Sequence, residues 1–100
     1  TRESASGAAY RVALVQAMEN MVILQDAGAP VTFGTDAGPA GRFPGYFEHM
    51  ELALMVGGGL TPTQALLAAT SVAASCLGLD DIGTLEPGKW ADFIVLDEDP

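Results

Sequence analysis

The sequence has few of the residues on which several protein classes depend. It contains a single cysteine, Cys76, so neither an internal disulfide bond nor a Cys-x-x-Cys metal site can form. Four Lys and Arg residues stand against 13 Asp and Glu, and the formal net charge is −9. This charge excludes a basic surface for nucleic acid or an anionic membrane. Apolar runs are too short to span a bilayer, and no signal peptide is recognisable.

Apolar residues, in contrast, are abundant. They make up 49% of the 100 residues, which excludes an intrinsically disordered chain and is enough for one small folded unit. The sequence begins Thr-Arg-Glu without a methionine and stops at Pro100, directly after an apolar run that resembles a strand. We therefore expect the chain to be a piece of a longer protein.

The first third of the chain predicts a loop, a helix and a strand. Residues 1–7 are small and polar, as in a loop. Apolar residues then recur at spacings of three and four, which predicts an amphipathic helix that ends at Gly28, before Pro30. One face of this helix carries Leu14, Met18, Met21 and Gln25, with Val15 and Val22 beside them. The β-branched and aromatic segment 31–35 predicts a buried strand.

The middle of the chain predicts a long loop and two further helices. Residues 36–46 are rich in Gly and Pro, and a helix is expected over 47–56, before the glycine run 57–59. Thr61-Pro62-Thr63-Gln64 is typical of a helix start, with Thr61 as N-cap and Gln64 completing a capping box. We expect this helix to continue to Leu77 and to end at Gly78.

The last segment changes character. Residues 83–85 are expected to be extended, and residues 86–89 match a type II turn, with Pro87 and Gly88 at its centre. The apolar residues 91–96 predict a strand. The acidic residues that follow keep its open end hydrated.

Asp36 is the strongest candidate for a functional residue. It directly follows the predicted strand and opens the Gly/Pro loop. Ligands of α/β folds gather beyond the carboxyl ends of strands, where a carboxylate can bind a metal or accept a proton. The alternative is that Asp36 only caps the turn, as Asp-x-Gly sequences often do.

Other polar residues carry weaker signals. His49, Arg42 and Tyr46 are candidate substrate contacts, but each can equally be a solvated surface residue. Glu48, His49 and Glu51 do not share one helix face, so this spacing does not predict a metal site. Cys76 falls on the apolar face of an alanine-rich helix and is expected to be buried and unreactive.

Four stretches together resemble the metal-dependent amidohydrolase superfamily, in its imidazolonepropionase-like and Xaa-Pro-dipeptidase-like branch. The sequence Phe-Gly-Thr-Asp-Ala-Gly at 33–38 is similar to the motif of the eighth strand. Residues 51–66 resemble the helix pair that follows, and 68–74 a helix with an Ala-Ala-Thr motif. Residues 77–96 resemble the return of the chain into a small β-sandwich.

The resemblance implies an α/β fold. The chain would be the C-terminal fragment of a (β/α)8 TIM barrel, with its last helix, eighth strand and closing helices, plus terminal strands of the β-sandwich. Residues 1–79 would then end the barrel of the hydrolase, and residues 80–100 would belong to the composite sandwich domain.

The resemblance also implies a chemistry. Asp36 would be both a metal ligand and a catalytic residue in a hydrolase that cleaves C–N bonds of a small amide, cyclic amide or dipeptide with metal-activated water. The cofactor would be one or two divalent ions, zinc above all. The remaining ligands, on other strands of the barrel, are absent from this chain. The 100 residues alone are therefore expected to be inactive.

Partners follow from the same reasoning. The chain would pack against the missing N-terminal part of the barrel, and a homo-oligomer is compatible with its apolar faces. We expect no nucleic acid or membrane partner and a cytoplasmic location. One alternative is a non-catalytic scaffold or subunit-contact module that completes a barrel. Another is a degenerate relative that keeps the fold without the metal.

Overall fold

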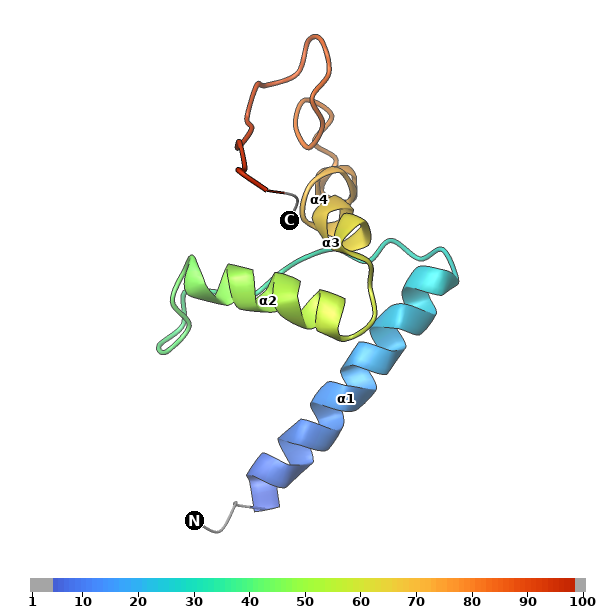
Figure 1. Cartoon of the computed structure of the whole chain (residues 1–100), viewed down its shortest axis with the longest axis vertical. Helices are drawn as coiled ribbons and strands as arrows, with labels where there is room; N and C mark the ends of the chain where they lie inside the picture. Colours follow the sequence, from blue (N-terminus) through green and yellow to red (C-terminus); the bar gives the residue numbers. More distant parts are fainter. Residues whose placement is uncertain (1–4, 99–100) are drawn as a thin grey trace.

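The computed structural model describes residues 5–98, which form four helices: α1 (Ala5–Asp26), α2 (Tyr46–Gly57), α3 (Pro62–Ala69) and α4 (Ser71–Leu77). Helix α1 projects away from the others, and the irregular segment after α4 extends at the opposite end (Figure 1). The radius of gyration is 15.9 Å, whereas a compact domain of this length has one of about 13 Å. The chain is therefore an extended arrangement with a small core.

Helix α1 ends as the sequence predicts. Gly28 adopts a positive φ of 79°, its N–H donates to the Gln25 carbonyl at 3.0 Å, and the Ala29 N–H donates to the Leu24 carbonyl at 3.0 Å. These are the paired bonds of a Schellman motif. The loop predicted for residues 1–7 is wrong where it overlaps α1, because residues 5–7 are helical and contain no helix-stopping proline. Residues 1–4 lie outside the described residues.

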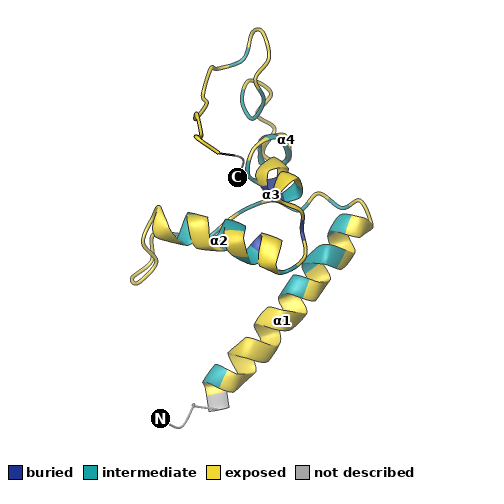
Figure 2. Cartoon of the chain, viewed as in Figure 1, coloured by how far each residue is buried: buried dark blue, intermediate teal, exposed yellow. Residues whose placement is uncertain are grey.

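The core lies where α2, α3 and the second half of α1 meet (Figure 2). Its buried cluster and the half-buried residues around it are Met55, Leu60, Ala65 and Ala68, with Met21, Val22, Val31, Phe33 and Leu52 packed against them. Glycines let the chain after α2 approach α1 closely. A Cβ atom on Gly58 would lie 3.1 Å from the Met18 Cβ, and one on Gly59 would lie 3.1 Å from the Val22 Cγ2.

The start of α3 confirms the predicted capping box. The Gln64 N–H donates to the Thr61 Oγ1 at 3.2 Å, and the Thr61 N–H donates to the Gln64 Oε1 at 2.8 Å. Pro62 occupies the first turn, where its missing N–H costs no hydrogen bond. Both donors at this helix end are thus satisfied by side chains three residues apart.

Thr61→Ala is expected to lower the free energy of unfolding by about 1 kcal/mol, because the Gln64 N–H loses its acceptor. Thermal unfolding of the full-length protein measures the change. Thr63→Ala, also exposed and in the first turn of α3, is the matched control and should have a smaller effect. Equal melting temperatures for the two variants would show that the cap contributes nothing.

The single helix predicted from Thr61 to Leu77 is wrong, because the chain breaks at Thr70. Thr70 has φ −125° and ψ −95°, outside the helical region. Its hydroxyl donates to the Leu66 carbonyl at 2.7 Å, and its N–H bonds to the Leu67 carbonyl at 3.2 Å. Such back-bonding by a β-branched residue bends helices. Helix α4 then ends at Gly78, in the left-handed conformation, as predicted.

Gly83 packs against this break. A Cβ atom on Gly83 would lie 2.7 Å from the Ala74 Cβ and 3.0 Å from the Thr70 carbonyl oxygen, and Gly83 has a φ of +83°. The contact joins the C-terminal segment to α4. No sequence pattern predicted it, because the two sides are brought together only by the fold.

The strands predicted for 31–35 and 91–96 are not confirmed, because the described part of the chain contains no β-ladder. A strand requires a neighbouring strand for its hydrogen bonds, and neither segment has one among residues 5–98. The Phe33 N–H donates instead to the Ala68 carbonyl at 3.0 Å. Residues 83–85 likewise form no ladder. Segment 91–96 is exposed, with Ile94 and Val95 82% and 84% accessible.

Burial nevertheless alternates along residues 31–37. Val31, Phe33 and Thr35 are half-buried, whereas Thr32, Gly34 and Asp36 are exposed. This period of two is that of an extended strand with two distinct faces. One face packs on the helices, and the other, which carries Asp36, is open.

The C-terminal segment is held by polar contacts. The Trp90 indole N–H donates to the Asp81 carboxylate at 2.8 Å, and the Trp90 backbone N–H donates to the Asp81 carbonyl at 2.9 Å. The predicted turn at 86–89 is confirmed by a 3.2 Å bond from the Lys89 N–H to the Glu86 carbonyl and by a φ of 92° at Gly88.

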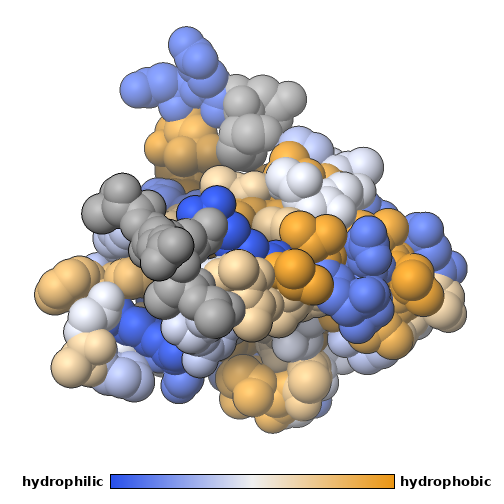
Figure 3. Space-filling view, turned by 90° about the horizontal axis from the view of Figure 1, so that it is seen from below, coloured by the Kyte–Doolittle hydropathy of each residue, from blue (hydrophilic) through white to orange (hydrophobic). Residues whose placement is uncertain are grey.

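The prediction that Cys76 is buried is wrong. Cys76 is exposed, and the buried residue of α4 is Ala74 instead. Large apolar side chains are also exposed elsewhere, and Figure 3 shows them interspersed with polar side chains on one face. Among residues 5–98, no helix has the length and hydrophobicity needed to cross a bilayer.

Candidate functional site

Asp36 lies at the end of the extended segment, on its open face. It is the one described residue other than glycine with a positive φ, 51°. Such a conformation costs a non-glycine residue on the order of 1–3 kcal/mol, although Asp adopts it more readily than most. The side chain is 83% accessible. The backbone is therefore strained at the residue that the sequence singled out, and the carboxylate is accessible to ligands.

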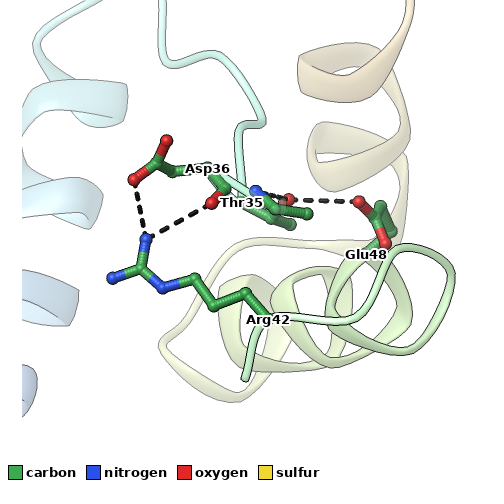
Figure 4. Close-up of polar contacts among 5 residues, drawn as sticks. Thr35, Asp36, Arg42 and Glu48 are labelled. Atoms are coloured by element: carbon green, nitrogen blue, oxygen red, sulfur yellow. Dashed lines mark hydrogen bonds and ion pairs between the residues drawn. The ribbon is translucent and has the colours of Figure 1, made fainter. Parts of the chain in front are cut away.

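Arg42 reaches back across the loop to Asp36 (Figure 4). Its Nη1 lies 2.7 Å from the Asp36 Oδ2 and 3.3 Å from the Asp36 carbonyl oxygen. A tight turn delivers it there: the Arg42 N–H bonds to the Pro39 carbonyl at 3.0 Å, and the Gly38 N–H bonds to the Arg42 carbonyl at 3.2 Å. Since the Arg42 side chain is 49% accessible, this is a surface ion pair worth about 0–1 kcal/mol, and a ligand can displace it at low cost.

Glu48 joins the two ends of the loop. Its Oε1 accepts a hydrogen bond from the Thr35 hydroxyl at 3.2 Å, and its Oε2 accepts one from the Gly45 N–H. The Thr35 hydroxyl in turn accepts from the Ala37 N–H at 3.2 Å (Figure 4). The sequence did not predict this role, and Glu48 was considered there only with His49 and Glu51, as a metal cluster that the spacing does not support. The signal was there: a Gly three residues before a Glu at a helix start is a capping pattern.

The pKa of Glu48 is held below its usual range. The largest cause is the hydrogen bond from its own backbone N–H; partial desolvation raises the pKa, and the Gly45 N–H, the Thr35 hydroxyl and the nearby His49 lower it further. All these groups favour the ionised carboxylate. The loop contacts of Glu48 are therefore those of an anion.

The pH dependence follows from this depressed pKa. A carboxyl whose pKa is lower in the folded state stabilises that state above its unfolded pKa of about 4.3. The stabilisation is lost as the pH falls through the lower, folded value. We therefore expect acid unfolding of Glu48→Gln to be less steep below about pH 4.5 than that of the wild type. Thermal unfolding from pH 7 to pH 3 measures this, and identical pH profiles would contradict it.

The other predicted site residues are not joined to Asp36. Tyr46 is exposed, and its ring packs edge-on against Phe47, with centroids 5.4 Å apart. His49 is exposed on α2. Within residues 5–98, no hydrogen bond or ion pair links either side chain to Asp36. Of the candidate substrate contacts, the structure brings only Arg42 to the Asp36 carboxylate.

Comparison with known proteins identifies the family. The amidohydrolase family model matches residues 7–100, nearly the whole chain. The chain belongs to the amidohydrolase family. It is 51% identical over 74 residues to the imidazolonepropionase of Deinococcus deserti and 49% identical over 74 residues to that of Deinococcus radiodurans. The imidazolonepropionase of Streptomyces avermitilis is 39% identical over 74 residues.

These alignments cover only part of each relative. They include 73% of this chain but 18% of the length of either Deinococcus protein, and 74% and 18% for the Streptomyces protein. The chain thus spans about a fifth of the curated relatives that it matches. No solved structure matches it.

The residues of this amidohydrolase chain can supply part of a metal site. Among residues 5–98, no group of three or more His, Cys, Asp and Glu side chains could hold a metal ion. A catalytic zinc takes about three protein ligands. Asp36 fits the requirement for one of them, since its carboxylate is exposed and paired only with a displaceable surface arginine. Any further ligands have to come from outside the described residues.

Proposed function

We propose that this chain is part of a longer metal-dependent hydrolase that cleaves C–N bonds in a small amide, a cyclic amide or a dipeptide. Membership of the amidohydrolase family and the similarity to imidazolonepropionases support this reaction class. The observation that carries the proposal is the position of Asp36, an accessible carboxylate at the end of an extended segment and on its open face.

The proposed fold is the closing part of a (β/α)8 barrel over residues 1–79, followed by strands of a β-sandwich over residues 80–100. The alternating burial of residues 31–37 supports a barrel strand, in which one face packs on helices and the other points to the barrel interior. Asp36 would then lie at the carboxyl end of that strand, where the active sites of such barrels are found.

In this function Asp36 is a ligand of a divalent metal, for which we propose zinc. Such a metal, when bound, lowers the pKa of a coordinated water to about 7 and so supplies a nucleophile at neutral pH. The Asp36 carboxylate can accept the proton that is released and pass it to the leaving amine. Arg42, Tyr46 and His49 are proposed substrate contacts, and Arg42 orients the carboxylate in the absence of other ligands.

The test uses the full-length protein that contains this chain. It is assayed for hydrolysis of imidazolonepropionate and of a panel of dipeptides, before and after removal of metal by a chelator and after addition of zinc. We expect turnover that is lost with the metal and recovered with zinc. Folded protein that shows no turnover on any of these substrates even after addition of zinc would instead favour a scaffold or subunit-contact role. A cytoplasmic location stays a prediction from the sequence.

A further inference from the structure

Glu48 contacts both ends of the loop that carries Asp36, yet it does not bond to Asp36 itself. We propose that Glu48 is a positioning residue, which fixes the direction of the Asp36 carboxylate by tying Thr35 to the first turn of α2. This inference rests on the proposed role of Asp36 as a metal ligand and extends it to a residue outside the motif.

The Thr35 hydroxyl can donate one hydrogen bond and can accept others through its lone pairs. It donates to the Glu48 Oε1 at 3.2 Å and accepts from the Ala37 N–H at 3.2 Å. The second bond spans Asp36 and closes a small turn around it, as Ser and Thr hydroxyls do two residues ahead. Asp36 keeps its positive φ of 51° within this turn.

The other carboxylate oxygen of Glu48, Oε2, accepts a hydrogen bond from the Gly45 N–H. Gly45 has a φ of 88° and lies where the chain enters α2. One carboxylate therefore bonds to residues on both sides of the loop 36–44. Because Glu48 lies on a helix whose Met55 is part of the buried core, the loop is anchored to a helix that packs in the core.

Arg42 and the Thr35–Glu48 hydrogen bond hold Asp36 in different ways. Arg42 holds the carboxylate directly, with 2.7 Å between its Nη1 and the Asp36 Oδ2, but this is one of the two oxygens that a metal would take. The Thr35–Glu48 hydrogen bond acts on the backbone around Asp36 and leaves both Asp36 carboxylate oxygens to the metal. This hydrogen bond can therefore persist when a metal replaces Arg42, so its loss should weaken metal binding.

The experiment measures zinc affinity of the metal-free full-length protein by chelator competition, together with amide hydrogen exchange of the 37–45 peptide. Glu48→Ala is expected to weaken zinc binding on the order of tenfold and to accelerate exchange in that peptide. Thr35→Val should have the same two effects, Thr35→Ser should restore wild-type behaviour, and the double variant should be no worse than the more severe single variant.

Glu51→Ala is the matched control, since it removes a carboxylate one turn further along α2 that does not bond to the loop. If Glu48→Ala and Glu51→Ala bind zinc equally well, the positioning role is overturned, whatever their melting temperatures. Asp36→Asn distinguishes a failure of the proposed metal site from a failure of the positioning role of Glu48. If that variant keeps full zinc affinity, the proposed metal site itself is wrong. If it loses zinc while Glu48→Ala does not, only the positioning role fails.

Discussion

Asp36→Asn is expected to lower kcat/KM of the full-length hydrolase by about 10²- to 10⁴-fold, the usual contribution of a positioned acid or base. Asparagine has nearly the same shape and also tolerates the left-handed conformation, so the φ of 51° can be kept. What disappears is the negative charge and the capacity to accept a proton. The loss should therefore come from chemistry and metal binding, with little change in folding.

Steady-state kinetics, zinc content and thermal unfolding of the same preparations check this expectation. Asp26→Asn, which removes another exposed carboxylate, at the end of α1, is the control and should leave kcat/KM unchanged. An Asp36→Asn enzyme with normal turnover would exclude a catalytic role for Asp36. Normal zinc content with low turnover would retain the proton-transfer role and exclude Asp36 as an essential ligand.

Gly83→Ala is expected to be strongly destabilising, at roughly 2–5 kcal/mol. The added Cβ would meet the Ala74 Cβ at 2.7 Å and the Thr70 carbonyl oxygen at 3.0 Å. Overpacking of this kind costs about 1–3 kcal/mol, and the positive φ of 83° adds about 1–2 kcal/mol. Relief would require the C-terminal segment to move away from α4.

Gly88→Ala distinguishes the cost of overpacking from the cost of the positive φ. Gly88 also has a positive φ, 92°, but a Cβ atom there would meet nothing within 4 Å. It should therefore cost only the conformational term of about 1–2 kcal/mol. Calorimetric unfolding of both variants in the full-length protein measures the difference. Equal destabilisation would mean that Gly83 is needed for its backbone conformation alone and that the packing on α4 is readily adjusted.

Helix ends were the part of the fold that the sequence predicted best. The end of α1 at Gly28, the start of α3 at Thr61 and the end of α4 at Gly78 all depend on residues within a few positions of each other. Local hydrogen bonds and a single positive φ decide such ends, so the signal is contained in the local sequence.

The features that failed depend on distant parts of the chain. The break at Thr70 is accompanied by the approach of Gly83, which no window of sequence around Thr70 contains. The segments 31–35 and 91–96 have strand composition, but a ladder also needs a partner, and none lies among the described residues. For the same reason Cys76, on a helix face that composition marks as apolar, is exposed.

Of the candidate site, the sequence predicted Asp36 but not the loop contacts of Glu48. Asp36 was found because a carboxylate after a strand-like run is distinctive, and Arg42 was included only as a substrate contact, whereas the structure pairs it with Asp36. Glu48 was overlooked although its contact with Gly45 has a local capping signal, and its contact with Thr35, 13 residues away, becomes visible only when the loop is closed.

The alternating burial of residues 31–37 determines which changes in chain length the site can tolerate. Successive side chains there face opposite sides, so one codon inserted between Val31 and Phe33 would, with Val31 in place, turn Phe33 outward and the Asp36 carboxylate toward the helices. No single substitution moves so many groups at once. An insertion at the exposed Ala40 or Gly41 would leave both faces in place. We therefore expect natural length variation in this region to be confined to the tip of the loop.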